Sequence, residues 1–358
     1  MDTISAQTLS RPLPKMNSTI EERNVWGQSR VLVTGGAGFI GSALVWALNT
    51  RGCSNVVIAD SAAPAERRHN LKTLQFIDYL DPYAALERLS SGSLAPFDYI
   101  FHLGACSSTT EMDMDYLRRN NYEYSKTLAE HSLDAGARFV YASSAATYGA
   151  RPDMDDTDDR GLASLLPLNP YGHSKHMMDL HAWREGWLDR VIGLKYFNIF
   201  GPNEDHKAGM RSVVLKSFAQ VKQTGAIRLF KSYRPDYGDG EQKRDFLYVK
   251  DAVKMTLYLA ANRAANGIFN IGSGEAHTWN ELARAVFAAL GLEPHIEYIE
   301  MPEAIRDKYQ YYTRADIRKL RARGYAARIT PLDAAVRDYV VQYLRPGKSL
   351  GEETESAE

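Results

Sequence analysis

The chain has few cysteines, no excess charge and no long apolar run. Only two of its 358 residues, Cys53 and Cys106, are cysteines, and neither stands in a CxxC pair or at metal-ligand spacing. A disulfide scaffold and a metal centre are therefore not expected, and a reducing, cytoplasmic compartment fits best. The formal net charge of −1 offers no electrostatic footprint for a polyanion, so we expect no nucleic-acid partner.

Hydrophobic segments are equally limited. No run of 18 apolar residues occurs, so neither a membrane-spanning helix nor a membrane partner is expected. Residues 1–29 contain no apolar core of the kind that a signal peptide needs, and we interpret them as a disordered tail in which Met16 is an alternative start. The end of the chain, residues 346–358, is predicted to be a disordered acidic tail.

What the sequence does contain is a regular alternation of short apolar strands with helices. Helical segments separate the strands, the first of them ending at Gly52. Strands are predicted at residues 30–36, 55–60, 98–105, 138–145 and 191–201. This alternation predicts an α/β fold of the Rossmann type, with a doubly wound parallel sheet.

The pattern changes after Gly201, where a long loop and short mixed elements follow. We therefore predict a dinucleotide-binding Rossmann domain over residues 30–200, to which residues 245–275 return as a further helix and strand. A smaller, mixed α/β substrate-binding domain is predicted over residues 201–244 and 276–345.

A glycine-rich loop follows the first predicted strand. The stretch "GGAGFIG" places Gly35, Gly38 and Gly41 between a strand and a helix, where backbone N–H groups can approach a pyrophosphate. Asp60 ends the second predicted strand, 19 residues after Gly41, as expected for an acid that binds an adenosine ribose. A glycine pattern alone often marks only a tight turn, but strand, helix and acid together predict a dinucleotide site.

These residues leave the choice between NAD and NADP open. Asp60 alone favours NAD. Arg67 and Arg68 follow close behind it and are within reach of a 2′-phosphate, unless both are simply solvated surface side chains.

Hydroxyl and amine side chains follow the later strands. "YASSAATYG" places Ser143 and Ser144 at the carboxyl end of a strand, where open α/β sheets bind ligands, although serines there often only satisfy turns. In "NPYGHSK", Asn169 is a predicted N-cap, so Tyr171 and Lys175 should share one face of the next helix. A nearby ammonium is expected to lower the pKa of the tyrosine from about 10, which makes Tyr171 a usable proton acceptor and donor.

Together, the glycine loop, Ser144 and the YxxxK pair resemble the extended short-chain dehydrogenase/reductase family, over roughly residues 30 to 345. This resemblance implies that Ser144 is a catalytic serine and Tyr171 the acid/base. It also implies that Lys175 contacts the nicotinamide ribose. The fold alone does not set the substrate, because this fold carries many reactions.

A second lysine follows the strand predicted at residues 191–201. The stretch "YFNIFGPNEDHKAGM" presents His206 and Lys207 in a loop that leads into a helix. A reaction that removes and replaces a proton on either face of a carbon benefits from two acid/base groups, for which Tyr171 and Lys207 are candidates. Taken alone, Lys207 is more often a solvated loop lysine.

Seven stretches, among them "ACSSTTE" and one containing "HKAGM", resemble more narrowly the ADP-L-glycero-D-manno-heptose 6-epimerase family. That resemblance implies an isomerase of lipopolysaccharide-core heptose synthesis. Such an enzyme interconverts ADP-D-glycero- and ADP-L-glycero-β-D-manno-heptose by transient oxidation at C6 with bound NADP. The implied partner is this small nucleotide sugar, the implied bases are Tyr171 and Lys207, and the implied assembly is a homo-oligomer.

The narrower resemblance also implies binding residues. Besides the glycines of the loop, those expected at the cofactor are Phe39, Ile40, Asp60, Ser61, Arg67, Leu103, Gly104, Ala105, Cys106, Ser107, Asn120, Tyr171, Lys175, Ile199 and Lys207. Those expected at the substrate are Ser144, Asn198, Gly209, Lys216, Phe230, Lys231, Ser232, Arg244 and Tyr309. The guanidinium of Arg244 suits a diphosphate, because it can form bidentate, charge-assisted bonds.

The chain departs from the family pattern at several of these positions. Leu103 stands where some members have glutamate, and Pro82 where a lysine contacts the cofactor. Gly209 and Lys216 stand where a serine and a histidine touch the substrate. Residues 233–241, "YRPDYGDGE", form an insertion that lengthens a substrate loop. The four candidate catalytic side chains are intact.

Other functions remain open at this point. A net dehydrogenase, a 4,6-dehydratase or an epimerase of another nucleotide sugar would use the same fold, but a dehydratase is expected to carry an Asp-Glu pair where this chain has Ala145 and Ala146. A non-catalytic dinucleotide-binding protein usually loses the tyrosine or lysine of YxxxK, and this chain keeps both. Arg244 also admits a plainer interpretation as a surface ion pair with Glu241 or Asp245, and Tyr309 as a packed aromatic.

Overall fold

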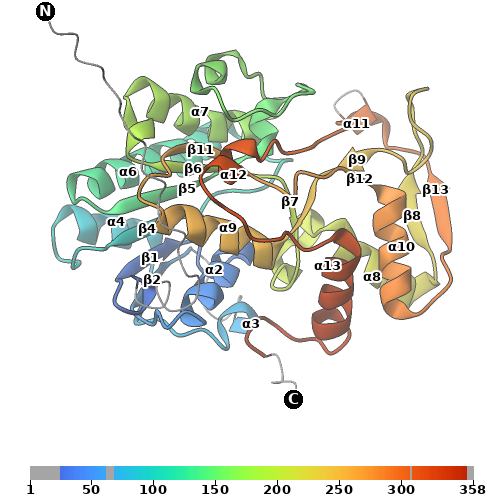
Figure 1. The fold of residues 1–358 in the computed structure, drawn as a ribbon, viewed down its shortest axis with the longest axis horizontal. Coiled ribbons are helices and arrows are strands. Elements are labelled where there is room, and N and C mark those ends of the chain that lie inside the picture. The colour runs from blue at the N-terminus through green and yellow to red at the C-terminus, as the bar shows by residue number, and fades with distance from the viewer. Residues whose placement is uncertain (1–24, 62–67, 307–308, 353–358) are drawn as a thin grey trace, which may run out of the picture.

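The central element of the molecule is a large parallel sheet. The structure, a computed structural model, describes residues 25–61, 68–306 and 309–352 (Figure 1). Within these ranges the sheet has seven strands in the order β11-β6-β5-β4-β1-β2-β3, paired in parallel. The strands are β1 (Val31–Thr34), β2 (Val56–Ala59), β3 (Asp78–Leu80), β4 (Tyr99–His102), β5 (Arg138–Ser144), β6 (Ile192–Tyr196) and β11 (Gly267–Ile271). The predicted Rossmann-type α/β fold is confirmed.

Helices cover both faces of this sheet (Figure 1). On one face α2 (Phe39–Asn49) packs against α9 (Val249–Ala261). On the other, α6 (Tyr124–Asp134) contacts both α4 (Pro82–Ser90) and α7 (Pro170–Arg184). All residues of β1, β2 and β4 are buried, as is usual for strands that are covered on both faces.

The strand predicted at residues 191–201 is in fact two strands. After β6, the backbone N–H of Phe197 donates to the carbonyl of Ile271 at 3.0 Å, and that of Ile199 donates back to Phe197 at 2.9 Å. This tight turn ends the pairing within the large sheet. The chain continues as β7 (Asn198–Phe200), which pairs in parallel with β10 (Phe246–Tyr248). The chain therefore leaves the large sheet at the carboxyl end of β6, and β7 begins there.

The helix predicted after the fourth strand is interrupted by a wider turn. It consists of α5 (Met114–Leu117), a π-helical stretch at Arg118–Glu123, and α6. A π turn inserts one extra residue and redirects the side chains that follow, and such turns are frequent at functional sites. Here the redirected side chain is Asn121, which is buried against the loop after β4.

The remaining elements include two short sheets at the right of Figure 1. In one, β8 (Ile227–Phe230) pairs in parallel with β13 (Ile296–Ile299), and in the other β9 (Lys243–Arg244) pairs antiparallel with β12 (His277–Thr278). The other described α-helices are α3 (Arg68–Leu71), α8 (Val213–Thr224), α10 (Trp279–Leu290), α11 (Glu303–Arg306), α12 (Arg318–Ala322) and α13 (Leu332–Asp338). The division into two domains with these boundaries stays a prediction.

Both ends of the folded part extend beyond the predicted tail boundaries. Trp26 is 1% exposed and packs on Tyr99 with ring centroids 4.7 Å apart, so the core already begins at Trp26. At the other end Leu350 is fully buried, and its N–H donates to the Asn203 side chain at 3.1 Å. The tails predicted at 1–29 and 346–358 are therefore too long, because apolar side chains anchor their inner parts. Residues 1–24 and 353–358 lie outside the described ranges.

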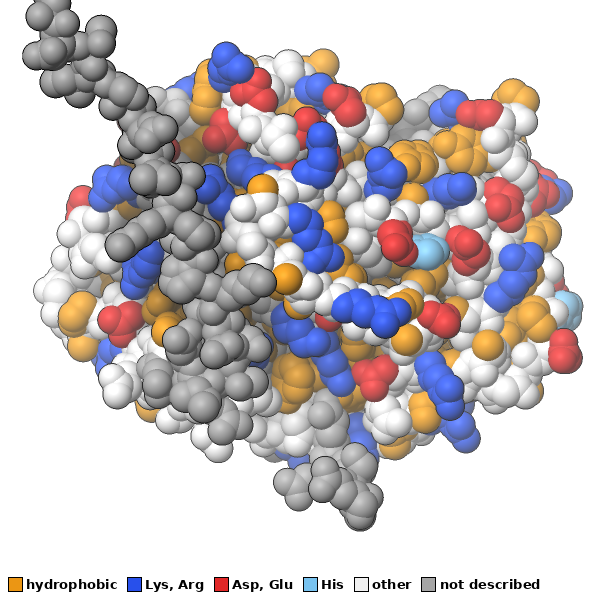
Figure 2. All heavy atoms as spheres, in the orientation of Figure 1, with side chains coloured by type: hydrophobic (Ala, Val, Ile, Leu, Met, Phe, Trp, Pro, Cys, Tyr) orange, Lys and Arg blue, Asp and Glu red, His pale blue; other side chains and the backbone are white. Residues whose placement is uncertain are grey.

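Charged side chains of both signs are mixed on the face of the described residues that Figure 2 presents. Figure 2 shows lysine and arginine side chains interspersed with acidic and apolar ones over the face that it presents. Across residues 25–61, 68–306 and 309–352, no helix combines the length and the apolar character that crossing a membrane requires.

Candidate active site

Two adjoining cavities lie at the carboxyl ends of the central strands. The first has a volume of about 540 Å³ and the second of about 360 Å³. Both are lined by Phe39, Ile40, Leu103, Ala105, Ser107, Ala142, Lys207 and Met210. Because open α/β sheets bind ligands outside the carboxyl ends of their strands, we treat the two cavities as one candidate active site.

The glycine-rich loop forms the inner wall of the first cavity. Gly35 has a left-handed backbone with φ of +68°, and a Cβ there would lie 2.7 Å from the Cα of Gly104. A Cβ on Gly41 would lie only 2.0 Å from the carbonyl oxygen of Gly35. Gly38 is the N-cap of α2, so the first N–H groups of the helix are presented to this wall. The glycines thus let the loop fold tightly against Gly104 and present a helix N-terminus to the cavity, which fits a dinucleotide pyrophosphate.

Gly41→Ala is expected to weaken dinucleotide binding by about tenfold or more and to destabilise the fold by about 1–3 kcal/mol, because the added methyl overpacks the loop. The measurements are the nucleotide released from the purified, denatured protein and the thermal unfolding midpoint. Gly161→Ala is the matched control, since a Cβ there meets open space. Equal nucleotide content in the two variants would contradict a pyrophosphate site at this loop.

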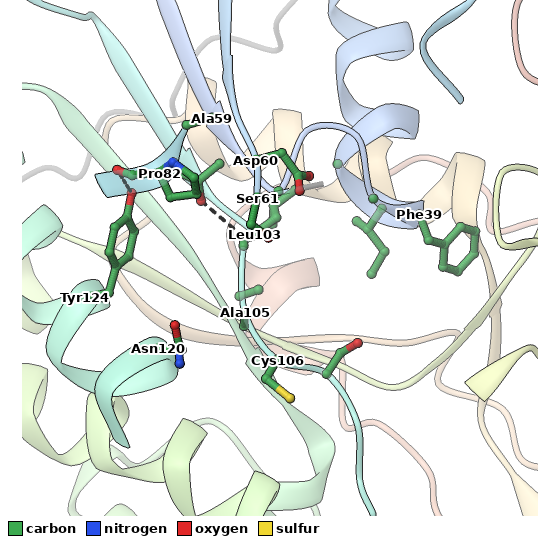
Figure 3. A pocket seen from close by; sticks show the side chains of 18 of the residues that line it. Phe39, Ala59, Asp60, Ser61, Pro82, Leu103, Ala105, Cys106, Asn120 and Tyr124 are labelled. Atoms are coloured by element: carbon green, nitrogen blue, oxygen red, sulfur yellow. Dashed lines mark hydrogen bonds between the residues drawn. The ribbon is translucent and has the colours of Figure 1, made fainter. Parts of the chain in front are cut away.

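Asp60 and Ser61 line the first cavity at the end of β2 (Figure 3). Asp60 is 6% exposed, and its carboxylate accepts a hydrogen bond from the N–H of Ala37 at 3.1 Å. The acid is therefore joined to the glycine loop as well as facing the cavity. Arg67 lies outside the described residues, and nothing is described of the Arg68 side chain.

The loop after β4 forms the opposite wall. The N–H of Gly104 donates to the Thr34 hydroxyl at 3.1 Å. The Asn121 side chain accepts from the N–H of Cys106 at 2.8 Å, donates to its carbonyl at 2.9 Å, and donates to the Ser174 hydroxyl on α7 at 3.0 Å. Asn121 thus joins the loop after β4 to α7, the helix that carries Tyr171.

Asn120 and Pro82 border the far end of the first cavity (Figure 3). The Asn120 side chain accepts from the Tyr83 hydroxyl at 3.2 Å. Pro82 is the first residue of α4, and its carbonyl accepts from the Tyr124 hydroxyl at 3.0 Å. At position 82, where the resemblance implies a lysine, this chain has the proline that begins α4, and the carbonyl of this proline already accepts a hydrogen bond.

The predicted serine, tyrosine and lysine line the second cavity. Asn169 caps α7 by accepting from the N–H of Gly172 at 2.7 Å, as expected, and this sets the face that carries Tyr171 and Lys175. The hydroxyl of Ser144 lies close enough to that of Tyr171 to affect its pKa, and Lys175 donates to the carbonyl of Ala142 at 3.0 Å. The three polar heads therefore meet at the end of β5.

The pKa of Tyr171 differs from the expectation. Burial raises the pKa of the phenol, and the hydroxyl of Ser144 works in the opposite direction. Lys175 is not what governs it, because its ammonium is bonded to the carbonyl of Ala142, and burial lowers the lysine's own pKa to about 8. In this structure Tyr171 is therefore a proton donor at neutral pH, and the predicted lowering of its pKa by Lys175 is wrong.

Activity is expected to fall as the pH rises through about 8. The pKa of Lys175 is lowered from 10.5 to about 8, so its charge is present below that pH and is lost above it. If the ammonium binds the cofactor ribose, kcat/KM should decline with one proton released. Lys175→Arg, which keeps its charge, should lack this alkaline limb. A wild-type profile flat to pH 10 would contradict the assignment.

Lys207 stands where the two cavities meet. It lies in the 3₁₀ turn Asp205–Met210, and its Nζ is 5.1 Å from the centroid of the Phe39 ring. Burial lowers the pKa of Lys207, and the Glu204 carboxylate partly offsets this. A lowered pKa increases the fraction of the amine that is neutral, and only the neutral amine can accept a proton. The solvated-loop interpretation does not fit this placement.

The loop that carries Lys207 is firmly anchored. Glu204 is fully buried, and its carboxylate accepts from the hydroxyl of Ser212 at 2.6 Å. Asn203 has φ of +76° and donates to the hydroxyl of Ser42 on α2 at 3.0 Å. These contacts hold the loop that carries Lys207 against α2 on one side and the start of α8 on the other.

Arg244 lies beyond the second cavity, stacked on aromatic rings. Its guanidinium carbon is 5.0 Å from the ring centroid of Tyr309 and 5.7 Å from that of Trp279, which lines the cavity. Within the described residues no carboxylate lies within ion-pair distance of it, because Asp245 instead accepts from the N–H groups of Ser273, Gly274 and Ala315. Arg244 therefore does not form the surface ion pair that the sequence allowed. It is a buried cation with no anionic partner among the described residues.

The predicted residues divide into three groups by position. The first cavity is lined by Gly35, Gly38, Phe39, Ile40, Gly41, Asp60, Ser61, Leu103, Gly104, Ala105, Cys106, Ser107, Asn120 and Lys207. The second is lined by Ser144, Tyr171, Lys175, Asn198, Ile199 and Lys207. Outside both linings lie Gly209, Lys216, Phe230, Lys231, Ser232, Arg244 and Tyr309. In this third group Lys216 donates to the carbonyl of Gly209 at 2.7 Å, and exposed Lys231 pairs with Glu300 at 2.7 Å.

Sequence reasoning missed several lining residues. Among them, Trp279 is the first residue of α10 and borders the second cavity. Its place had a signal, since Thr278 and Glu281 form a capping box that marks a helix start. Met210 and Tyr83 carried no comparable signal, because only the tertiary fold brings them to the cavities.

A buried ion pair lies beneath the second cavity. The Asp179 carboxylate on α7 accepts from the Lys195 ammonium at 2.7 Å, with side chains 0% and 1% exposed. It also accepts from the hydroxyls of Ser143 at 2.8 Å and Tyr141 at 3.0 Å. Lys195 donates further to Thr147. Both Ser143 and Ser144 line the second cavity, but the hydroxyl of Ser143 is engaged by Asp179.

Comparison with known proteins supports the sequence resemblance. A family model described as the NAD dependent epimerase/dehydratase family matches residues 31–272. The chain is 49% identical over 314 residues to the ADP-L-glycero-D-manno-heptose-6-epimerase of Nitratidesulfovibrio vulgaris strain DP4, and this match covers 87% of the chain and 97% of that relative.

Solved structures are similar over nearly the same span. The ADP-L-glycero-D-manno-heptose-6-epimerase of Helicobacter pylori matches with a TM-score of 0.74 and 27% identity, covering 88% of this chain and 96% of that one. The UDP-glucose 4-epimerase of Thermus thermophilus, solved in complex with NAD, matches with a TM-score of 0.67 and 27% identity, covering 87% and 97%.

Proposed function

The chain belongs to the NAD dependent epimerase/dehydratase family, and from this we propose that it is an isomerase that inverts C6 of ADP-glycero-β-D-manno-heptose. The observation that carries the proposal is the placement of two proton-transfer groups in one cavity. Tyr171 reaches it from α7, and Lys207 reaches it from the turn after β7. Redox-neutral inversion needs a proton removed and a proton returned, which two such groups can divide.

Residues of the first cavity would hold a nicotinamide dinucleotide. Gly35, Gly38 and Gly41 line the cavity where the pyrophosphate would lie, Asp60 would bind the adenosine ribose, and Lys175 would bind the nicotinamide ribose. When bound there, the dinucleotide supplies a hydride acceptor that later returns the hydride to the same carbon. The protein's own contribution is to orient C6 and to move protons at its oxygen.

The directions in which the pKa values of Lys207 and Tyr171 are shifted suggest which of them accepts a proton and which donates one. Lys207, whose pKa is lowered by burial, can take the proton of the C6 hydroxyl as that carbon is oxidised to a ketone. Tyr171, whose pKa is raised, stays protonated and can donate to the C6 oxygen as the carbon is reduced on its other face. The hydroxyl of Ser144 lies close to that of Tyr171. The substrate gains and loses one hydride and one proton, so no external oxidant is required.

We propose NADP rather than NAD as the dinucleotide. One oxygen of the Asp60 carboxylate accepts from the N–H of Ala37, and two arginines, Arg67 and Arg68, follow Asp60 in the sequence; a guanidinium is a side chain that suits a 2′-phosphate. Chromatography of the nucleotide released on denaturation tests this. Recovery of NAD alone would overturn the preference.

Further proposals rest on the resemblance. They are a cytoplasmic location, a role in lipopolysaccharide-core heptose synthesis and a homo-oligomeric state. Exposed apolar side chains such as Met112 at 71% and Leu166 at 78% are consistent with contacts between copies. Light scattering after gel filtration would test the assembly, and a monomeric mass would contradict it.

The deciding experiment uses purified protein and ADP-D-glycero-β-D-manno-heptose without added cofactor. Inversion at C6, followed by proton NMR, would support both the substrate and a retained cofactor. No inversion, even with NADP and NAD supplied, would overturn the proposed substrate. UDP-glucose and UDP-N-acetylglucosamine would then test the alternative of another nucleotide-sugar epimerase. A 4,6-dehydratase is disfavoured, since Ala145 and Ala146 follow Ser144 and open a 3₁₀ turn.

A further inference from the structure

The insertion at residues 233–241 is tightly built into the fold. The N–H of Ser232 donates to the Asp239 side chain at 2.7 Å, and Asn280 on α10 donates to the carbonyl of Asp239 at 2.9 Å. Gly240 has φ of +71°, and a Cβ there would lie 2.4 Å from the Asn280 side-chain oxygen. These contacts join the two ends of the segment to each other and to α10.

Tyr311 joins this insertion to the predicted substrate residues. It is 7% exposed, and its hydroxyl accepts from the N–H of Tyr233 at 3.0 Å. Its ring centroid lies 5.2 Å from that of Tyr237 on one side and 5.4 Å from that of Tyr309 on the other. Aromatic pairs at these separations attract and orient one another.

Arg234 closes the outer end of this stack. Its guanidinium carbon is 5.2 Å from the Tyr311 centroid and 5.6 Å from that of Tyr237. The same guanidinium forms two hydrogen bonds with Asp236, at 3.0 and 2.7 Å, so its charge is already matched. Arg234 is therefore suited to hold the rings, and it is a poor ligand for a phosphate.

Arg244 at the inner end has the opposite character. It is 7% exposed, stacks on Tyr309 and donates to the carbonyl of Lys243 at 2.8 Å, with no carboxylate partner among the described residues. A buried guanidinium without an anion carries a desolvation cost that an incoming diphosphate would offset. The orientation of Tyr309 is fixed from a second side by Trp279, whose indole N–H donates to its hydroxyl at 2.9 Å.

We propose that residues 233–241 form a substrate-affinity element. Tyr237 and Arg234 hold Tyr311 in place. Tyr311 in turn orients Tyr309 and Arg244 to bind the diphosphate of the nucleotide sugar. The inference rests on the proposed function and adds residues to its binding site. Tyr237 and Tyr311 are positioning residues, because they act through Tyr309 and Arg244. The element acts on ground-state binding and leaves the proton transfers at the second cavity unchanged.

The test separates substrate binding from turnover. Tyr237→Ala is expected to raise KM for ADP-heptose by about tenfold, and the Kd of ADP in calorimetry by a similar factor, with kcat within about twofold of wild type. Tyr237→Phe keeps the ring and should retain wild-type values. Arg228→Ala, which removes an exposed ion pair with Glu297 on the same small sheet, is the matched control.

The outcomes are distinct from those for the reaction itself. Unchanged KM and ADP affinity in Tyr237→Ala, or an equal loss of kcat, would overturn the inference. If that variant misfolds by circular dichroism, Arg234→Ala removes the outer end of the same stack and is expected to raise KM in the same direction. If the wild-type protein does not invert ADP-heptose, the proposed substrate is wrong. Titration of the wild type and of Tyr237→Ala with ADP and UDP would still test whether Tyr237 supports nucleotide diphosphate binding.

Discussion

Replacing Lys207 by methionine is expected to lower kcat for C6 inversion by about 10²–10⁴-fold, the usual contribution of a general acid or base, while the dinucleotide stays bound. Lys207 lines both cavities, and burial lowers the pKa of its amine, so a larger fraction is neutral and able to accept a proton than in a solvated lysine. Methionine keeps the length and the apolar contact with Phe39 but cannot carry a proton. Proton NMR of the sugar and the ultraviolet spectrum of the purified protein measure the two effects.

Lys222→Met is the control for that substitution. Lys222 lies on α8 close to the same loop in sequence, is exposed and stacks over Phe218. Its replacement should leave turnover unchanged. Near-wild-type turnover in Lys207→Met would rule out the two-base assignment. Loss of the bound dinucleotide would instead make Lys207 chiefly a cofactor ligand.

Tyr171→Phe is expected to reduce kcat by a similar factor of about 10²–10⁴. The substitution removes the hydroxyl that lies close to Ser144 and leaves the ring in place, so the fold and the dinucleotide content should not change. Turnover by NMR and unfolding by circular dichroism are the measurements. The control is Tyr258→Phe on α9, which removes a hydroxyl bonded to the carbonyl of Arg323.

The double variant adds a sharper test of the shared role. If Tyr171 and Lys207 serve one catalytic cycle, the loss in the double variant should be much less than the product of the two single losses, because either substitution already blocks the cycle. Multiplicative losses would show that the two side chains act independently. Such a result would contradict a mechanism in which one removes the proton that the other returns.

Local sequence patterns were sufficient for much of the fold and for the first cavity. A strand, glycines and a helix start follow one another within a few residues, and Asn169 caps its helix through a contact three residues away. Such features depend on neighbouring residues and can be read directly. The parallel pairing of the strands follows from their alternation with helices, whereas their order in the sheet does not.

The parts that could not be predicted depend on distant residues. Ser143 and Ser144 both line the second cavity, but the hydroxyl of Ser143 is bonded to Asp179, a residue far along α7 that no local pattern links to it. The direction of the Tyr171 pKa depends on burial, which no local pattern reveals. Asn121 was overlooked beside Asn120 because a π turn redirects it. Each of these is a tertiary effect.

The buried pair of Asp179 and Lys195 has a consequence for how the sequence can change over time. Loss of either partner alone leaves an uncompensated buried charge, at a cost of about 3–5 kcal/mol out of a total stability of about 5–15 kcal/mol. Replacement of both by apolar residues is tolerated far better. Selection therefore acts on the two positions as one inherited unit, and a lineage can leave the pair only by passing through a poorly folded intermediate sequence.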